Sequence, residues 1–129
     1  MKVMCISDIH GGIDNLKTVL ERYREEKCEK LLILGDFASN FYSSSDIEVA
    51  EILNNMAGSI IAVRGNCDSS YQDEIFNFSL GILKTIDING RKVTLTHGHV
   101  YDRNHLPENT RRDIPIWTYT CCNIRKNRR

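Results

Sequence analysis

The sequence has no long apolar run, which excludes the commonest way for a chain to cross a membrane. No stretch approaches the roughly 20 consecutive apolar residues that a membrane-spanning helix needs. The N-terminus also lacks a basic segment followed by a long apolar one, so nothing predicts a secretory signal. We therefore expect a protein without membrane contact that resides in the cytoplasm.

Paired cysteine motifs and a net charge are also missing. Five cysteines without a C-x-x-C pair fit free thiols in a reducing compartment better than a disulfide framework. The net charge is zero, but residues 111–129 carry six Lys or Arg and one acid, which leaves residues 1–110 at −5. Because the basic charge lies in this tail, nucleic acid is not an expected partner, although a nucleic-acid-binding arm is an alternative reading of the tail.

Apolar patterning predicts an α/β protein that begins with parallel strands. Residues 2–7, 31–34 and 59–63 form nearly continuous apolar runs, typical of strands that are buried on both faces. Helical spacing predicts a helix over 13–26, and capping-box spacing at 45–48 predicts another that reaches about residue 56. Alternating runs on either side of Asn89-Gly90 predict a β-hairpin over 82–96. A parallel sheet followed by antiparallel strands is therefore expected.

Candidate metal ligands follow the predicted strands in four places. The motifs are Asp8-x-His10, Gly35-Asp36, Gly65-Asn66-Cys67-Asp68 and His97-Gly98-His99. Each acidic residue, taken alone, has a structural reading, because Asp at a strand end often caps a helix or closes a turn. Mixed carboxylate, amide and imidazole ligands suit Mn, Fe or Zn, and strand ends gather at one edge of an α/β sheet. Together the motifs predict a dinuclear metal site and a hydrolase.

The local spacing within these motifs suggests how the ligands are presented. Asp8 and His10 lie two residues apart, so an extended segment would direct both side chains from one face as a chelating pair. Gly11 lets the backbone turn tightly and offers an amide at the start of the following helix, which is a favourable place for phosphate. The carboxylate of Asp36 has two oxygens and can bridge two cations. His97 and His99 lie on either side of Gly98, so one of them is the expected ligand and the other is expected to support it.

The order of these motifs resembles that of the calcineurin-like metallophosphoesterases, especially their small bacterial and archaeal phosphodiesterase branch. The resemblance covers about residues 1–106, and we divide the chain into a metallophosphoesterase domain, 1–110, and an atypical basic tail, 111–129. The likeness implies that one metal is held by Asp8, His10 and Asp36, and the other by Asp36, Asn66 and His97. The last three would serve catalysis. The implied fold is an α/β sandwich of two mixed β-sheets flanked by helices, with the second sheet incomplete.

The resemblance also implies a mechanism. Two divalent ions about 3.5–4 Å apart would lower the pKa of a bridging water and place hydroxide in line with phosphorus. Mn is favoured, with Ni, Fe or Zn as alternatives, and the substrate is a small phosphodiester. The oligomeric state stays open, with a homo-oligomer as one option.

Three residues near the motifs have open roles. Many relatives have a His after the motif Asn that donates a proton to the leaving group, and Cys67 stands in that place. A thiol is a poor substitute, which favours substrates with good leaving groups, such as aryl phosphodiesters. Asp68 either orients a ligand, caps a helix or closes a turn. Arg64 either contacts substrate phosphate or lies on the surface.

The Gly-His-x-His motif that closes the family pattern does not follow His105. Reading permissible codons for residues 114–124 one nucleotide later gives Gly-His-Thr-His, in which the single Trp codon forces the Gly. We therefore expect a truncated or frame-shifted C-terminus from about Thr110, weak metal binding and little activity. His105 or the Cys121-Cys122 pair offers an alternative source of ligands. An inactive product, or a non-catalytic scaffold of the same fold, is the alternative to an active enzyme.

Overall fold

Four parallel strands form the first sheet of the computed structural model, which describes residues 1–39, 43–102, 104–108 and 116–117. The strand order β1-β2-β3-β4 follows the order in the chain. Register pairs Val3 with Lys30 and Leu31 with Ile60, so the first three strands end near one another. The strands are β1 (Val3–Ile6), β2 (Lys30–Ile33), β3 (Ile60–Val63) and β4 (Leu80–Gly81). The three predicted buried strands are thus confirmed, and β4 is an additional short strand.

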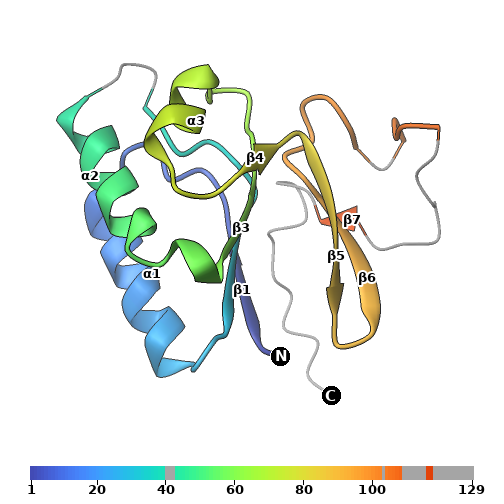
Figure 1. Cartoon of the computed structure of the whole chain (residues 1–129), viewed down its shortest axis with the longest axis horizontal. Helices are drawn as coiled ribbons and strands as arrows, with labels where there is room; N and C mark the ends of the chain where they lie inside the picture. The colour runs from blue at the N-terminus through green and yellow to red at the C-terminus, as the bar shows by residue number, and fades with distance from the viewer. Residues whose placement is uncertain (40–42, 103, 109–115, 118–129) are drawn as a thin grey trace.

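Helices cover one face of this sheet (Figure 1). They are α1 (Ile13–Glu25), α2 (Ser44–Asn54), α3 (Ser70–Ile75) and a short 3-10 helix, η1 (Ala57–Ser59). The capping box of α2 pairs Ser43 with Asp46, so the prediction that the box begins at Ser45 was wrong by two residues. Helix α3 was not predicted, although Ser69 and Gln72 form a capping box at its start. Within the described residues, no helix is long and apolar enough to span a membrane.

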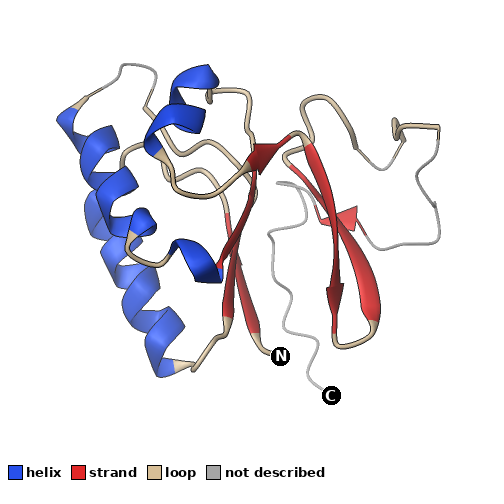
Figure 2. Ribbon diagram, in the orientation of Figure 1, coloured by secondary structure: helices blue, strands red, loops and turns tan. Residues whose placement is uncertain are grey.

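A second sheet packs on the opposite face of the first (Figure 2). It contains the antiparallel hairpin of β5 (Leu83–Ile88) and β6 (Arg91–Thr96), and β6 pairs in parallel with β7 (Ile116–Trp117). Asn89 and Gly90 have φ of 52° and 81°, the left-handed conformation that a tight hairpin turn requires. The hairpin prediction is confirmed. Strand β7 lies in a segment for which no strand was predicted.

Alternation along the strands divides the apolar side chains between two cores. In β2, Leu31 and Ile33 face the helices, whereas Leu32 lies in the core between the sheets. The helix-side core also contains Leu16, Leu20, Phe37, Val49, Ala50, Leu53, Ile60, Ala62 and Phe76. The inter-sheet core also contains Leu34, Val63, Val93 and Leu95. Burial on both faces explains why these strands read as continuous apolar runs, and it holds their ends in fixed relative positions.

Candidate metal centre

The candidate ligands lie in loops that directly follow β1, β2, β3 and β6, and backbone hydrogen bonds hold the first two loops together. The N–H of Asp8 donates to the carbonyl of Gly35 at 3.0 Å, and the N–H of His10 donates to the carbonyl of Asp36 at 3.1 Å. The loop after β1 therefore lies directly against the loop after β2. This contact places the first Asp-x-His motif beside the Gly-Asp motif.

Three of the candidate ligands have a left-handed backbone. Asp8, His10 and Asp36 have φ of 59°, 46° and 58°. The expectation of an extended backbone from Asp8 to His10 was therefore wrong, but the two side chains do meet, with Oδ1 of Asp8 3.1 Å from Nε2 of His10. Such a conformation costs about 1–3 kcal/mol per non-glycine residue and clusters at functional sites, where surrounding contacts maintain it. The left-handed backbone at these three residues therefore indicates a functional site in these loops.

The carboxylate of Asp36 occupies the centre of the arrangement. Its Oδ2 lies 3.6 Å from Nε2 of His10 and 3.5 Å from Nε2 of His97. Its Oδ1 accepts a hydrogen bond from the backbone N–H of Cys67 at 2.9 Å. The side chain of Asp36 is almost fully buried, as is that of His97, whereas His10 is exposed. One carboxylate oxygen thus faces two imidazoles, in the position of a bridging ligand.

The hydrogen bonds of the two imidazoles test whether the residues fit metal ions. Nδ1 of His10 faces the carbonyl of Ala38 at 3.2 Å, and its Nε2 faces Oδ1 of Asp8 at 3.1 Å. Nδ1 of His97 faces the carbonyl of Leu34 at 2.7 Å.

The other ring nitrogen of His97, Nε2, faces Oδ1 of Asn66 at 2.9 Å. A neutral imidazole has one proton, so it cannot satisfy acceptors at both nitrogens. With the proton on Nδ1, each Nε2 lone pair can bind a cation that is shared with the facing oxygen. The donor set therefore fits two divalent ions.

The electrostatics around His10 favour positive charge at this position. Partial burial acts to lower the pKa of His10, but the hydrogen bond to Asp8, the Ala38 carbonyl and the charge of Asp36 outweigh it. The pKa of His10 is consequently raised above its ordinary value. The same acceptors that stabilise a proton on this ring would stabilise a metal ion.

Asp68 connects the loops that carry Asp36 and Asn66. Its Oδ2 accepts from the N–H of Asp36 and the N–H of Gly65, both at 2.8 Å, and its Oδ1 accepts from the N–H of Phe37 at 2.9 Å. Burial raises the pKa of Asp68, against the lowering effect of these three hydrogen bonds. The side chain thus positions the backbone of Asp36, and Ser69 rather than Asp68 caps α3.

Two glycines permit the close approach of the same two loops. Gly35 has φ of 99°, and a Cβ on it would lie 2.3 Å from the backbone nitrogen of Gly65. A Cβ on Gly65 would lie 2.1 Å from Oδ1 of Asp36. Neither contact is sterically allowed, so both motif glycines are needed for the ligands to meet.

The remaining predicted site residues lie at the edge of this cluster or outside it. The N–H of Gly11 donates to the carbonyl of Phe37 at 3.0 Å, so it is engaged within the protein rather than directed at phosphate. The guanidinium of Arg64 forms an ion pair with Asp73 of α3. His99 is exposed, and its ring contacts that of His97 with centroids 5.4 Å apart. Burial, followed by the charge of His97, lowers the pKa of His99.

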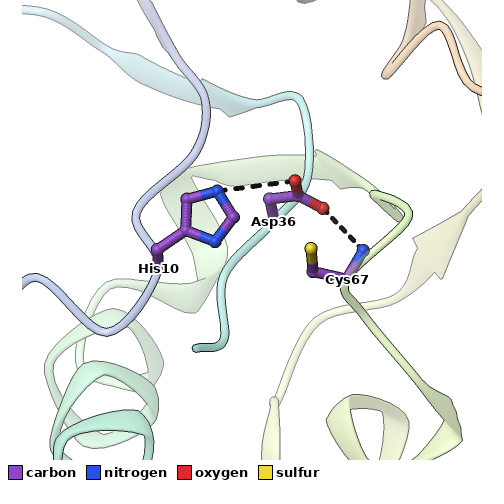
Figure 3. A group of neighbouring side chains, drawn as sticks. All are labelled: His10, Asp36 and Cys67. Atoms are coloured by element: carbon purple, nitrogen blue, oxygen red, sulfur yellow. Dashed lines mark hydrogen bonds and ion pairs between the residues drawn. The ribbon is translucent and has the colours of Figure 1, made fainter. Parts of the chain in front are cut away.

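Cys67 contributes more than its sequence position suggested. Its Sγ, an imidazole nitrogen of His10 and a carboxylate oxygen of Asp36 all lie within 4.8 Å of one another (Figure 3). Asp8, Asp36 and His97 form a second group within the same limit. The sequence indicated Cys67 only as a replacement for a proton donor. The carbonyls of Leu34 and Ala38, which orient the imidazoles, were also missed, although both flank the Gly-Asp motif.

The C-terminal predictions can be placed only in part. His105 is exposed and its Nδ1 faces Asp102 at 3.1 Å, so it is not among the ligand groups found in the described residues. The expected frame shift from Thr110 and the Cys121-Cys122 pair lie outside the described residues, apart from β7.

Comparison with known proteins identifies the family. Residues 1–116 match the model of the calcineurin-like phosphoesterase superfamily domain. The chain is 32% identical to phosphodiesterase YfcE of Escherichia coli over 127 residues, which cover 93% of this chain and 69% of YfcE. It is 27% identical to a phosphodiesterase of Methanocaldococcus jannaschii over 106 residues, which cover 77% of this chain and 60% of that protein.

Solved structures agree with these matches. A structure of YfcE, described as a phosphoesterase from E. coli, superposes with a TM-score of 0.74 at 33% identity and covers 83% of this chain and 63% of that chain. A structure of an archaeal phosphodiesterase gives a TM-score of 0.61 at 26% identity, covering 77% of this chain and 60% of the other. These matches confirm the α/β fold with its two sheets. With motifs, fold and ligand geometry in agreement, the chain belongs to the calcineurin-like phosphoesterase superfamily.

Proposed function

We propose that the protein is a metal-dependent phosphodiesterase that acts through a dinuclear metal centre. The observation that carries this proposal is the position of Asp36 Oδ2, 3.6 Å from Nε2 of His10 and 3.5 Å from Nε2 of His97. Oxygens of Asp8 and Asn66 face the same two nitrogens. The phosphodiesterases among the relatives support the choice of phosphodiester over other phosphate compounds.

Five residues would hold the ions. Asp8, His10 and Asp36 hold one, while Asp36, Asn66 and His97 hold the other. When bound, a pair of divalent ions lowers the pKa of a water nucleophile and offsets the negative charge that grows on the phosphoryl oxygens. Manganese is our first choice, because Asp8, Asp36 and Asn66 offer carboxylate or amide oxygens, the ligand type that suits manganese.

The protein itself orients the metal ligands and sets which groups can donate a proton. The carbonyls of Leu34 and Ala38 keep both imidazoles in the tautomer that directs Nε2 into the site. Asp68 holds the backbone of Asp36, whose buried carboxylate lies next to the two rings. Cys67 is a weak proton donor, so the leaving group departs with little help, and aryl phosphodiesters are the favoured substrates.

Hydrolysis of bis(p-nitrophenyl) phosphate with added Mn²⁺ tests this function. Low turnover is expected in the presence of Mn²⁺, because the sequence lacks the closing Gly-His-x-His motif. This turnover should be lost after chelation, and Asp36→Asn and His97→Ala should be nearly inactive. His105→Ala is the matched control, because His105 is exposed and contacts Asp102. The proposal fails if the folded chain shows no turnover with Mn²⁺, Ni²⁺, Fe²⁺ or Zn²⁺, or if Asp36→Asn retains full activity. Cytoplasmic localisation stays a prediction from the sequence.

A further inference from the structure

The thiol of Cys67 projects toward one half of the metal centre. Figure 3 shows the sulfur on the same side as the imidazole of His10 and the carboxylate of Asp36, and the ligand atoms of the three lie within 4.8 Å of one another. The second ligand group, with Asp8 and His97, has only nitrogen and oxygen donors. Of the two ligand groups, only the one that includes Cys67 therefore offers a sulfur donor.

Local contacts fix this orientation of Cys67. Its backbone N–H donates to Oδ1 of Asp36 at 2.9 Å, which keeps its Cα beside the bridging carboxylate. Its Sγ lies 3.7 Å from Nδ2 of Asn66, which donates to it while Oδ1 of the same amide faces His97. The sulfur thus accepts a hydrogen bond from Asn66, a residue of the candidate centre.

The donor chemistry of this group differs from that of the remaining ligands. An imidazole, a carboxylate and a thiol are the ligands of zinc sites, whereas manganese prefers oxygen and nitrogen. His10, Asp36 and Cys67 lie in the loops after β1, β2 and β3, so no strand residue is part of this group. A soft cation bound by His10 and Asp36 would therefore find a third, sulfur ligand in place.

We propose that Cys67 is a ligand for thiophilic divalent cations, so that Zn²⁺ or Co²⁺ bound by His10 and Asp36 also takes its sulfur. The thiol proton passes to solvent as the sulfur lone pair binds the cation. The sulfur then occupies a position that the phosphodiester and its water nucleophile need. Zn²⁺ consequently inhibits where Mn²⁺ supports turnover. This inhibition rests on the proposed phosphodiesterase function, whereas the sulfur ligation does not.

Absorption spectroscopy with Co²⁺ tests the ligation directly. Metal-free wild-type protein titrated with Co²⁺ is expected to develop a sulfur-to-cobalt charge-transfer band in the near ultraviolet together with visible d–d bands. Cys67→Ser is expected to lose the charge-transfer band and keep d–d bands, and the wild-type-minus-variant difference isolates Cys67 from the other cysteines. Cys28→Ser, which changes a partly buried thiol after α1, is the control that keeps the band.

Alkylation of the unmodified chain gives a second measurement that needs no variant. Iodoacetamide labelling, located by mass spectrometry, is expected to be slowed at Cys67 by Zn²⁺ at least tenfold, with Cys28 unaffected and with little slowing by Mn²⁺. Equal slowing by both ions, a charge-transfer band that persists in Cys67→Ser, or wild-type d–d bands without such a band would each overturn the proposal.

Activity measurements distinguish a failure of the sulfur-ligation proposal from a failure of the phosphodiesterase proposal. If Mn²⁺-dependent turnover is present and Zn²⁺ inhibits wild type and Cys67→Ser equally, the sulfur is not the inhibitory ligand, although the phosphodiesterase proposal stands. If Co²⁺ produces the band but no metal supports turnover, the ligation stands and the proposed function fails. A tenfold or larger rise in the Zn²⁺ concentration needed to inhibit Cys67→Ser is the expected result.

Discussion

At the scale of single residues, the site is defined by oxygen acceptors that face both ring nitrogens of His10 and of His97. Nε2 of His97 faces an amide oxygen of Asn66 at 2.9 Å while Nδ1 faces a carbonyl, an arrangement that a neutral ring cannot satisfy alone. Burial makes an unmatched polar contact of this kind costly. A cation between the ring nitrogen and the oxygens removes the conflict, so the geometry that looks unfavourable for the protein alone is suited to metal binding.

Substitution of Asp68 should show how much the site depends on a residue that holds the backbone of a ligand without being a ligand itself. Its carboxylate accepts three backbone hydrogen bonds from two loops, and bonds to charged groups contribute about 1.5–3 kcal/mol each. We predict that Asp68→Ala lowers the free energy of unfolding by about 2–4 kcal/mol in urea titration. Mn²⁺ affinity should fall as well, because the backbone of Asp36 loses its support.

The matched control for Asp68 is Asp73→Asn, which removes one carboxylate from the exposed ion pair with Arg64. Surface pairs contribute about 0–1 kcal/mol, so its stability should change little. Calorimetric titration of both variants with Mn²⁺ completes the test. Unchanged Mn²⁺ affinity in a folded Asp68→Ala protein would show that the side chain only stabilises the loops.

Cys67 should limit the range of leaving groups. Burial and the charge of Asp36 raise the pKa of its thiol, which makes it a poor acid, whereas imidazole donates protons readily near neutral pH. We predict that Cys67→His increases kcat for alkyl phosphodiesters by about 10²-fold, in line with general acid catalysis. Rates for bis(p-nitrophenyl) phosphate should change much less, since its leaving group needs no proton. Equal effects on both substrate classes would argue against a proton-donor position.

At the scale of elements, the approach of the β2 and β3 loops controls whether the ligands meet. A Cβ on Gly35 would lie 2.3 Å from Gly65 N and 2.6 Å from Gly65 Cα, both of them backbone atoms that cannot rotate away. We predict that Gly35→Ala separates the two loops, destabilises the fold by more than about 1 kcal/mol and abolishes Mn²⁺ binding. Chemical unfolding and metal titration measure the two effects.

Gly58→Ala is the control for that substitution. Gly58 lies in η1, and a Cβ there would meet no heavy atom within 4 Å. Its stability and metal binding should therefore match those of the wild type. If Gly35→Ala also behaves as the wild type, the close contact of the two loops is not what brings Asp36 to Asn66.

The ease of prediction differed between elements for physical reasons. Strands β1 to β3 were predictable because both of their faces pack against apolar cores, although β1 is only partly buried. Such packing favours apolar residues at successive positions. The short elements α3 and β4 were not, because six and two residues carry too little periodicity. The four ligand motifs were visible as polar groups after strands. The left-handed turns at Asp8 and His10 were not, because inter-loop hydrogen bonds maintain them rather than local preference.

At the scale of the molecule, the candidate centre connects the two sheets. Asp8, Asp36 and Asn66 follow strands of the first sheet, whereas His97 follows β6 of the second. An inter-sheet apolar core also joins them, with Leu32 and Val63 on one side and Val93 on the other. Metal binding should consequently stabilise the packing of one sheet on the other as well as the loops.

Thermal unfolding with and without Mn²⁺ tests this connection. A ligand that binds only the folded state adds about 2.7 kcal/mol to the free energy of unfolding at a concentration 100 times its Kd. For a chain of 129 residues, we expect Mn²⁺ to raise Tm by several degrees and chelation to reverse the rise. His97→Ala removes the only ligand of the centre that the described part of the second sheet supplies, so it should lose most of the Mn²⁺-dependent rise, while His105→Ala keeps it. Amide hydrogen exchange should show Mn²⁺-dependent protection in both β2 and β6 of the wild type and only in β2 of His97→Ala. Protection confined to the first sheet in the wild type would mean that His97 does not bind the ion, and the two-sheet centre would have to be abandoned.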